Sequence, residues 1–311
     1  MPSYCGFDPE KDVADLSGKV ILVTGGTAGL GKSAILTLAA HNPSHIYFTG
    51  RSASSATSLL ESLKSLSPPV ETTFLECDLT SLSSIRAAST KFRHDRLDIF
   101  IANAGIMAVD AGLTKDGVEM QFGVNHLGNA ALLMHLLPVM LKTAELPNAD
   151  VRFVSVTSLG YRGHPKNGVD FATLHTTQED MFMGTWGRYG QSKFANIVFA
   201  RELHRRHSKI TSVVVHPGVI PTKLVTDLSF WKRMFVYVTN PTMMTVEQGG
   251  YNTVWAAAGV GSREKVEEEK GKVALYLPVG KGNGGDGMCF DEGVGRELWE
   301  WTEKEMSKVE G

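Results

Sequence analysis

Short runs of apolar, often β-branched residues alternate with longer amphipathic segments along most of this chain. The apolar runs occupy residues 19–26, 45–51, 72–79, 97–105, 151–158, 211–218 and 272–278. The amphipathic segments predict helices over 30–40, 53–66, 82–92, 118–141, 189–206 and 246–258. Strands this uniformly apolar, each followed by a helix, predict a parallel sheet that is covered on both faces.

The alternation favours an α/β fold in which one doubly wound, seven-stranded parallel sheet forms a single domain over residues 1–311. Residues 1–16 precede the first strand and form an N-terminal extension. Ligands of such folds bind beyond the carboxyl ends of the strands. Two segments, 159–188 and 219–245, interrupt the alternation, and long interruptions in a compact domain are usually lids or binding loops.

A glycine-rich turn joins the first strand to the first helix. Its sequence, TGGTAGLGK over 24–32, spaces Gly25, Gly29 and Gly31 as GxxxGxG instead of GxGxxG. Glycines permit a tight turn and a close backbone approach, and a helix N-terminus attracts a pyrophosphate. The position directly after strand one therefore predicts a dinucleotide site, in preference to a turn with a purely structural role.

The end of the second strand bears on which dinucleotide binds. An NAD site usually places an acidic residue about 20 positions after the glycines, where it holds the ribose 2′-hydroxyl. Here the strand ends in FTGRS, with Gly50 and Arg51 and no carboxylate. An arginine at this point can bind a 2′-phosphate. The sequence therefore favours NADP(H).

Composition narrows the class of protein. The net charge is −2, with 42% hydrophobic and 21% charged residues and no concentrated Lys/Arg stripe, which argues against a nucleic-acid partner. Cys5, Cys77 and Cys289 are far apart, so neither a zinc site nor a disulfide framework is expected. The N-terminal residues are not typical of a signal peptide, and no apolar run reaches the length of a membrane span. We expect a cytoplasmic protein without an integral membrane segment.

The stretch WGRYGQSKF (186–194) places Tyr189 and Lys193 one helical turn apart, on one face of the predicted helix. A free phenol has a pKa near 10, and a cation beside it favours the phenolate and brings that pKa toward neutrality. The pair is thus either a proton-transfer device or two unrelated residues on a solvated helix, and by itself it does not distinguish them.

The order of the motifs makes that distinction. TGxxxGxG at 24–31, CDL with Asp78, ANAG at 102–105, VNHLG with Asn125, VSVTS ending at Ser158, Tyr189-x-x-x-Lys193 and HPG at 216–218 follow one another. Over about residues 17–260 the chain resembles the short-chain dehydrogenase/reductase superfamily, whose domain is of the Rossmann type. FGVNHLG, YGQSKFANIVFARELHRR and VVVHPGVI resemble its retinol-dehydrogenase-like branch in particular.

The resemblance implies four catalytic residues. Tyr189 would be the acid/base, and Lys193 would assist it and hold the nicotinamide ribose. Ser158 would position the substrate oxygen by a hydrogen bond. Asn125 would anchor a water that relays protons to Lys193. Because hydroxyls from Ser158 and Tyr189 would converge on one oxygen, a carbonyl is the favoured substrate group.

The resemblance also implies the cofactor contacts. Asp78 would meet the adenine edge, Asn103 to Gly105 would line the adenosine side, and Thr222 would contact the cofactor after the sixth strand. The full expected set is Gly25, Thr27, Gly29, Leu30, Gly31, Arg51, Asp78, Leu79, Asn103, Ala104, Gly105, Tyr189, Lys193, Pro217, Gly218 and Thr222. No metal site is expected.

The segment after the sixth strand is where this family places its substrate lid, here 219–245. It carries an aromatic and methionine stripe of Phe230, Trp231, Met234, Phe235, Tyr237, Met243 and Met244. Such a stripe is either core packing or the wall of a site for a bulky lipophilic ligand. Retinoid specificity itself does not carry over from the resemblance.

Together these features predict an NADPH-dependent carbonyl reductase or alcohol dehydrogenase that acts on a bulky lipophilic small molecule, for example a secondary metabolite. Reduction of a C=C or C=N bond, or a redox-neutral isomerisation, would use the same fold and cofactor. A non-catalytic NADP-sensing protein is the third alternative, although none of its catalytic residues is degraded. The sequence is compatible with a homo-oligomer.

Overall fold

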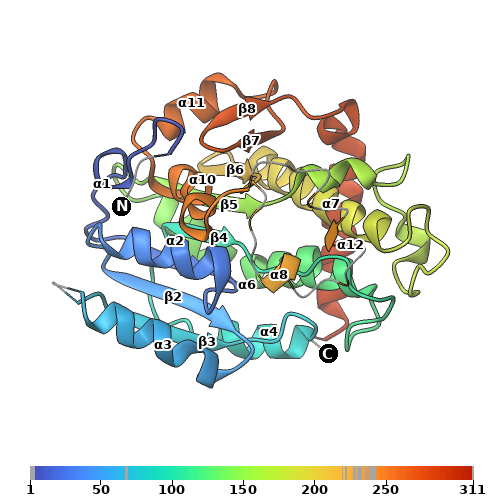
Figure 1. The fold of residues 1–311 in the computed structure, drawn as a ribbon, viewed down its shortest axis with the longest axis horizontal. Helices are drawn as coiled ribbons and strands as arrows, with labels where there is room; N and C mark the ends of the chain where they lie inside the picture. Colours follow the sequence, from blue (N-terminus) through green and yellow to red (C-terminus); the bar gives the residue numbers. More distant parts are fainter. Residues whose placement is uncertain are drawn as a thin grey trace.

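The computed structural model describes residues 4–66, 69–218, 220, 223–226, 229, 233–234, 237 and 243–309. Within these residues the chain forms one eight-stranded sheet in the order β3-β2-β1-β4-β5-β6-β7-β8 (Figure 1). The strands are β1 (Val20–Val23), β2 (His45–Gly50), β3 (Thr72–Glu76), β4 (Ile99–Ala102), β5 (Val151–Val156), β6 (Ile210–Val215), β7 (Leu275–Leu277) and β8 (Lys281–Asn283). The α/β fold with its doubly wound parallel sheet is confirmed.

The predicted number of seven strands is wrong by one. The eighth strand, β8, pairs antiparallel with β7 through Leu275 with Asn283 and Leu277 with Lys281. Its three residues, Lys-Gly-Asn, are mostly exposed and show no apolar alternation. The strand exists because residues 278–280 turn the chain back along the edge of the sheet, and apolar periodicity carries no trace of such a turn.

Alternation along the central strands explains why they are apolar throughout. In β1, Val20 and Leu22 belong to the core on one face of the sheet, and Ile21 and Val23 belong to the core on the other face. All four side chains are at most 2% exposed. Successive side chains of a strand point to opposite faces, so a strand buried on both sides needs an unbroken apolar run.

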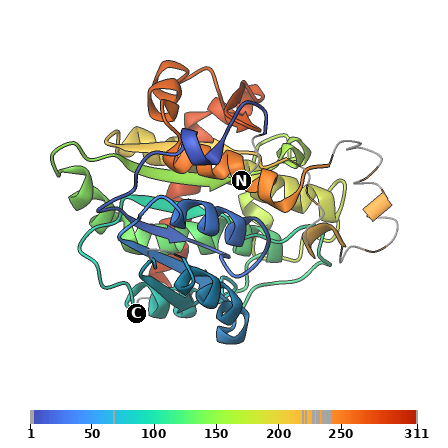
Figure 2. The same cartoon turned by 60° about the vertical axis from the view of Figure 1, so that its left-hand side comes forward.

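Two helical layers supply these cores, with the sheet between them (Figures 1 and 2). One layer contains α4 (Leu82–Ser89), α6 (Asn129–Ala144), α7 (Thr185–Arg206) and α12 (Glu292–Ser307). The other contains α2 (Gly29–Ala39), α3 (Ala53–Lys64), α10 (Val246–Ala258) and α11 (Ser262–Glu268). Shorter helices are α1 (Pro9–Asp12), α5 (Met120–Phe122), α8 (Lys223–Thr226) and the single turns η1 (Gly123–Gly128), η2 (Leu159–Gly163), η3 (Phe171–Thr173) and η4 (Gly287–Phe290).

The C-terminal helix α12 was not predicted from the sequence. It packs on α7, where the ring of Trp299 stacks on Phe199 with centroids 5.1 Å apart. One side of the helix is buried, through Gly295, Leu298, Trp299, Thr302 and Glu305. The predicted helix over 118–141 is also interrupted, because η1 is a π-helical turn between α5 and α6.

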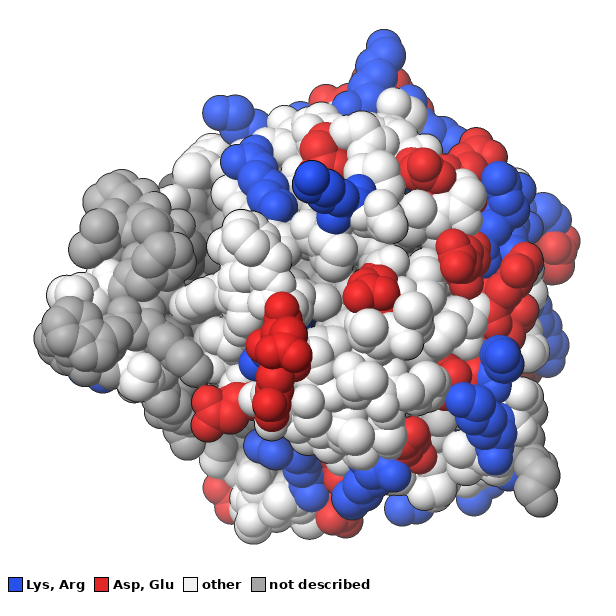
Figure 3. All heavy atoms as spheres, turned by 90° about the vertical axis from the view of Figure 1, so that its right-hand side faces the viewer, with Lys and Arg blue, Asp and Glu red and all other residues white. Residues whose placement is uncertain are grey.

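The helical run Met120–Ala144 is long and apolar enough to cross a membrane by length and composition alone. In the structure 72% of its most apolar window is buried inside the protein, between the sheet and its neighbouring helices. We therefore interpret it as a core helix of the fold. On the face drawn in Figure 3, basic and acidic side chains are interspersed around a broad uncharged area, without a large field of one sign.

Candidate active site

Helix α7 places Tyr189 and Lys193 one turn apart on its buried face. Tyr189 is 6% exposed and Lys193 is 5% exposed. The Lys193 Nζ lies 5.9 Å from the centroid of the Tyr189 ring and donates a hydrogen bond to the carbonyl of Val156, the last residue of β5, at 3.1 Å. The pair faces the carboxyl end of the central strands, so it is not part of a solvated helix surface.

Hydrogen bonds between β5 and α7 hold this pair in register with the strand. The Thr157 hydroxyl donates to the carbonyl of Lys193 at 2.6 Å, and the Ser155 hydroxyl donates to that of Asn196 at 3.2 Å. In return, the Asn196 side-chain amide donates to the carbonyl of Val156 at 3.2 Å. Ser158 lies two residues beyond the end of β5, directly after Thr157, so these hydrogen bonds also fix its position relative to Tyr189.

Ser158 and Tyr189 are brought into contact. Ser158 caps η2, and its Oγ accepts a hydrogen bond from the backbone N–H of Gly160 at 3.1 Å. A Cβ on Gly160 would lie 3.0 Å from Cε1 of the Tyr189 ring, so glycine lets the phenol approach this turn closely. The Ser158 hydroxyl lies 3.4 Å from the same Cβ position, so it is near the phenol, where it favours the phenolate.

The pKa values of the pair differ from the expectation that Lys193 lowers that of the phenol. Burial raises the pKa of Tyr189 to about 12, and the nearby Ser158 hydroxyl offsets this only in part. Burial likewise lowers the pKa of Lys193 to about 8. The ammonium of Lys193 donates its hydrogen bond to a carbonyl and not to the phenol oxygen, and both groups are removed from water. Desolvation disfavours the charged form of each group, so it outweighs the effect of the cation on the pKa of Tyr189. In the protein alone the tyrosine is a proton donor at neutral pH.

Asn125 lies in the π-helical turn η1 and is fully buried. Its Nδ2 donates to the carbonyl of Ile106 and to Oγ of Ser192, each at 2.9 Å, and its Oδ1 accepts from the Ile106 N–H at 2.7 Å. A Cβ on Gly105 would lie 2.9 Å from this Oδ1 and 3.3 Å from Lys193 Nζ. Asn125, Gly105 and Lys193 therefore meet at the end of β4. Such π-turns occur frequently at functional sites.

The glycine turn after β1 forms a cradle that side chains would fill. Gly25 and Gly29 have φ angles of +65° and +54°, in the left-handed region that favours glycine. A Cβ on Gly31 would collide with the carbonyl of Gly25 and lie 2.6 Å from Nδ2 of Asn103. Ala28 caps α2 without a side-chain hydrogen bond, so the first amides of this helix have no side-chain acceptor there. The cradle fits the phosphates of a dinucleotide.

The side chains expected at the adenosine end lie beside this cradle. Arg51 follows β2, is exposed and has no ion pair among the described residues. Thr27 packs against Gly50, where a Cβ would lie 2.5 Å from its Cγ2. The Asp78 carboxylate accepts hydrogen bonds from Thr80 on one oxygen and from the exposed Lys115 on the other, at 2.8 Å each. This carboxylate is therefore already held by the protein.

Other expected contacts are apolar or serve packing. Leu79 is buried against Gly128, and Cδ2 of Leu30 lies close to Gly249 of α10. The Asn103 amide donates to the carbonyl of Thr24 at 2.9 Å, which ties the ANAG loop, with Ala104, to β1.

Pro217 and Gly218 follow β6, and Gly218 has a φ of +88° and contacts Met244. Thr222 lies outside the described residues, as do Phe230, Trp231 and Phe235. Among the described residues of 228–245, Met244 is buried, whereas three side chains are 39–40% exposed, Met234, Tyr237 and Met243. The stripe is therefore not uniformly core packing.

Sequence reasoning missed two buried polar residues that tie the site together. The Thr24 hydroxyl donates to Oδ1 of Asn129 at 2.6 Å and accepts from the backbone amides of Asn103 and Ala104 at 3.0 and 2.9 Å. Asn129 in turn donates to the carbonyls of Ala104 and Asn125. The signal was available, because Thr24 directly precedes the glycines and Asn129 follows Asn125 by one turn.

A second missed group anchors the segment 159–188. Arg188 Nε lies 3.4 Å from Oε1 of Glu119, its Nη1 donates to the carbonyl of Gln178 at 3.1 Å, and both charged side chains are buried. Gln121 donates to the carbonyl of Thr185 at 2.9 Å. These contacts hold the first turn of α7, and Arg188 directly precedes Tyr189. Their partners are far apart in the sequence, so no local pattern reveals them.

Comparisons with known proteins agree with this geometry. Residues 19–160 match the family model described as short chain dehydrogenase. The short-chain dehydrogenase/reductase drtF of Aspergillus calidoustus is 33% identical, over 95% of this chain and 96% of its own.

Two solved structures are similar in fold. One, an uncharacterised protein from Mycobacterium paratuberculosis, has a TM-score of 0.73 at 24% identity, over 97% of this chain and 98% of its own. The other is a blue fluorescent protein from a metagenomic library, in complex with NADPH, with a TM-score of 0.59 at 26% identity, over 80% of this chain and 94% of its own.

Proposed function

The chain belongs to the short-chain dehydrogenase/reductase family of oxidoreductases, and we propose that it transfers a hydride between NADP(H) and a carbonyl or alcohol carbon of a bulky lipophilic small molecule. The observation that carries the proposal is the contact between Ser158 and Tyr189 at the end of β5, with Lys193 and Asn125 behind them. Two adjacent hydroxyls can hydrogen-bond one substrate oxygen, which is the arrangement that carbonyl reduction needs.

When bound, the reduced dinucleotide supplies the hydride. The protein supplies the proton: Tyr189 keeps its phenolic proton at neutral pH because burial raises its pKa to about 12. Ser158 holds the substrate oxygen against that phenol. Lys193 and Asn125 meet beside Gly105, and in this proposal Lys193 holds the nicotinamide ribose while Asn125 anchors a water that returns a proton through Lys193 to Tyr189.

The preference for NADP(H) rests on the end of β2. Arg51 is exposed beside the glycine cradle, and the position that would carry a ribose-binding carboxylate is occupied by Gly50. A guanidinium binds a phosphate through two parallel hydrogen bonds, so it distinguishes the 2′-phosphate from a 2′-hydroxyl. The similar blue fluorescent protein also holds NADPH, which supports the same choice.

The proposal of a lipophilic substrate is based on apolar side chains that face solvent near the start of α7 and after β6. Phe182 is 86% exposed and Met183 is 51% exposed, just before the helix that carries Tyr189. Met234, Tyr237 and Met243 are also partly exposed. Aromatic and methionine side chains adapt to bulky apolar ligands, and secondary metabolites are a source of such ketones.

The test is single-turnover oxidation of NADPH by the purified protein with a panel of lipophilic ketones and aldehydes, matched enones and cyclic imines. Turnover with the ketones supports the proposal. Turnover with only the enones or imines would assign C=C or C=N reduction instead. Tight NADPH binding without oxidation by any substrate, together with an unchanged Tyr189→Phe variant, would favour a sensor.

We also propose that the whole chain is one domain and that it works in a reducing, intracellular compartment. All three cysteines are free, and Cys77 and Cys289 are buried. Free thiols of this kind persist where disulfides are kept reduced.

A further inference from the structure

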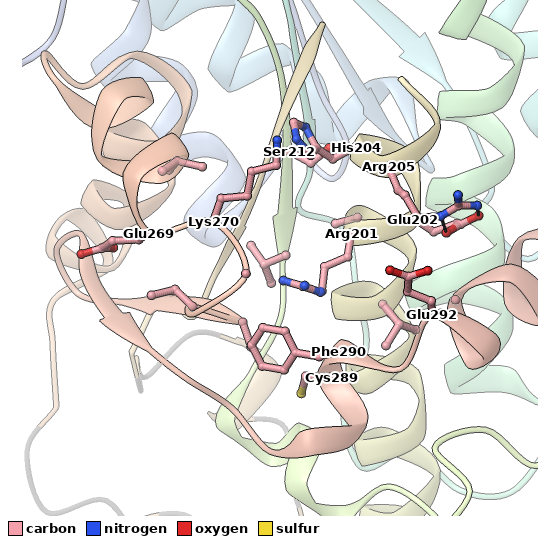
Figure 4. Close-up of a pocket in the computed structure, with 18 of the residues that line it drawn as sticks. Arg201, Glu202, His204, Arg205, Ser212, Glu269, Lys270, Cys289, Phe290 and Glu292 are labelled. Atoms are coloured by element: carbon pink, nitrogen blue, oxygen red, sulfur yellow. Dashed lines mark hydrogen bonds and ion pairs between the residues drawn. The ribbon is translucent and has the colours of Figure 1, made fainter. Parts of the chain in front are cut away.

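A cavity of about 310 Å³ lies apart from Tyr189, on the opposite half of α7. It is bounded by the second half of α7, by β6 and β7, by the end of α11 and by the residues that lead into α12 (Figure 4). Its apolar wall includes Val198, Val214, Val273, Ala274 and Phe290. None of the proposed catalytic residues lines it. The volume suits a small organic molecule.

One cation projects into this cavity without a partner. The Arg201 guanidinium lies over the ring of Phe290, with Cζ 4.2 Å from the ring centroid (Figure 4). No hydrogen bond or ion pair joins it to any residue that the structure describes. Burial lowers the pKa of Arg201, and the nearby charge of Glu292 offsets this only in part. Arg201 is half-buried and its nitrogens are not among the buried unpaired atoms, so its N–H donors remain accessible to a ligand that enters the cavity.

The other charges of the lining are already engaged. Glu202 binds Arg205 and Arg206 at 2.7 and 2.6 Å. Glu267 lies 3.5 Å from Lys270, and Oε1 of Glu269 lies 3.9 Å from Nζ of Lys265.

The acidic groups near the start of α12 are engaged as well. Glu292 lies 3.1 Å from Arg296, and the Asp291 carboxylate accepts from the first amides of α12. The excess of acidic residues around the cavity is therefore compensated within the protein, and Arg201 is left as the cation available to a ligand.

Three further polar atoms of residues in the lining have no hydrogen-bond partner within the described structure, namely Nε2 of His204, Oγ of Ser212 and Oε2 of Glu269. Nδ1 of His204 bonds the carbonyl of Ile210 at 2.9 Å, so it carries the proton and leaves Nε2 as an acceptor. That Nε2 and the Oγ of Ser212 are both buried, and neither has a hydrogen-bond partner within the described structure. The cavity thus offers a cation, an apolar wall and a small polar patch.

We propose that this cavity, the Arg201 cavity, binds a small organic acid with an apolar body. The carboxylate pairs with the guanidinium of Arg201, whose planar fork matches the two carboxylate oxygens. The apolar body lies along Phe290 and Val214, and a hydroxyl or carbonyl group on it reaches Ser212 and His204. An inorganic phosphate fits less well, because a single cation and an apolar wall would leave most of its oxygens without donors.

Calorimetric titration of the NADPH-saturated full chain tests this, with octanoate, benzoate and cinnamate, each beside its neutral amide. At least one acid should bind, and its amide should bind about tenfold more weakly or worse. Arg201→Gln should weaken the acid by about tenfold or more, and Phe290→Leu should weaken it less. Lys209→Gln is the matched control, since it removes an exposed cation near the end of α7 that does not line the cavity.

Thermal unfolding separates binding from structure. Without an acid, Arg201→Gln should unfold close to the parent's temperature, because the guanidinium makes no ion pair and loses only its contact with the Phe290 ring. With the acid, the parent's unfolding temperature should rise and that of Arg201→Gln should not. The proposal is overturned if no acid of the panel binds the parent, or if binding survives Arg201→Gln, as it would at the catalytic site. A destabilised Arg201→Gln that binds no acid while Phe290→Leu binds it at full strength would also overturn it.

Discussion

The ammonium of Lys193 lies 5.9 Å from the centre of the Tyr189 ring, and the packing of α7 on β5 removes both groups from water. Burial pushes the two pKa values apart, because it raises that of the phenol to about 12 and lowers that of the ammonium to about 8. The phenol of Tyr189 is therefore protonated at neutral pH, whereas the ammonium of Lys193 loses its proton only slightly above neutral pH.

Tyr189→Phe should abolish most turnover and leave NADPH affinity nearly unchanged. The substitution removes one oxygen and little volume, so α7 keeps its packing while the substrate oxygen loses its proton donor. We expect a fall on the order of 10²- to 10⁴-fold in the single-turnover rate. The measurement is stopped-flow NADPH oxidation, with fluorescence titration of the cofactor as the control.

Ser158→Ala should be intermediate, because it removes one of the two hydrogen bonds to that oxygen. A Tyr189→Phe protein with the parent's rate would show that this phenol is not the acid.

Lys193→Met should stabilise the cofactor-free protein at pH 7. The folded-state pKa of Lys193 is lowered to about 8, whereas the unfolded chain holds this proton up to about pH 10.4. Between these values the unfolded state binds more protons, so the parent's stability rises with pH across this window. Below pH 8 the folded protein bears the full cost of burying the charged ammonium. Removing that charge should raise the free energy of unfolding by on the order of 1–3 kcal/mol, reduced by the loss of the hydrogen bond to the Val156 carbonyl.

Urea unfolding of parent and Lys193→Met at pH 7 and pH 9.5 measures this difference. The gain should shrink at the higher pH. A gain that is equal at both values, or a variant less stable than the parent at pH 7, would contradict the lowered pKa.

Arg51→Gln should weaken NADPH binding by about tenfold or more and leave NADH binding nearly unchanged. One charge-assisted contact to the 2′-phosphate is sufficient for a tenfold effect, since about 1.4 kcal/mol is tenfold. Because Arg51 is exposed and unpaired among the described residues, its loss should not change stability. Parallel titrations with the two cofactors decide this. Equal affinities of the parent for NADPH and NADH would remove the basis of the NADP(H) assignment.

Gly31→Ala should weaken the cofactor by at least about tenfold, although alanine is the better helix former by about 1 kcal/mol. The added Cβ would collide with the carbonyl of Gly25 and with the Asn103 amide. Gly287→Ala is the control, because its Cβ would meet no atom within 4 Å and its φ is not positive. If Gly31→Ala behaves like Gly287→Ala in cofactor titration and thermal unfolding, the close approach is not a constraint.

Thr24→Val should lower the free energy of unfolding by on the order of 2–3 kcal/mol and also weaken the cofactor. It keeps the shape of the side chain but leaves the Asn129 Oδ1 and two backbone amides without their partner. The matched control is Thr253→Val, at a buried threonine whose hydroxyl has no hydrogen-bond partner among the described residues. Urea unfolding should show that variant neutral or stabilised. Equal effects of the two substitutions would argue against the Thr24 network.

An element of the fold can be predicted from the sequence when the residues that determine it are neighbours in the chain. The seven parallel strands could be predicted because both faces of the sheet are buried. Each strand therefore needs an apolar run of its own, which is visible without knowledge of the other strands. The helix predicted over 246–258 has the same bounds in the structure, where a capping box at Thr245 begins it and Gly259 ends it. Strand β8 was missed because a three-residue polar edge strand has no apolar alternation. Helix α12 was missed although its buried residues recur on one side of the helix, so its signal was present in the sequence.

The sequence by itself determined the α/β class and the glycine cradle, because each rests on residues that are neighbours in the chain. It also gave the catalytic candidates, because the motifs that carry them follow one another in the order of the family that the chain resembles. Only the tertiary structure shows that Asn125 and Lys193 both lie so close to Gly105 that they leave too little room for a side chain there. It alone also shows that Arg188 pairs with Glu119, which is far from it in the sequence. It also reversed the expected pKa shift of Tyr189. That shift depends on how completely the surrounding elements exclude water, and desolvation is a property of the packed protein that no short stretch of residues carries.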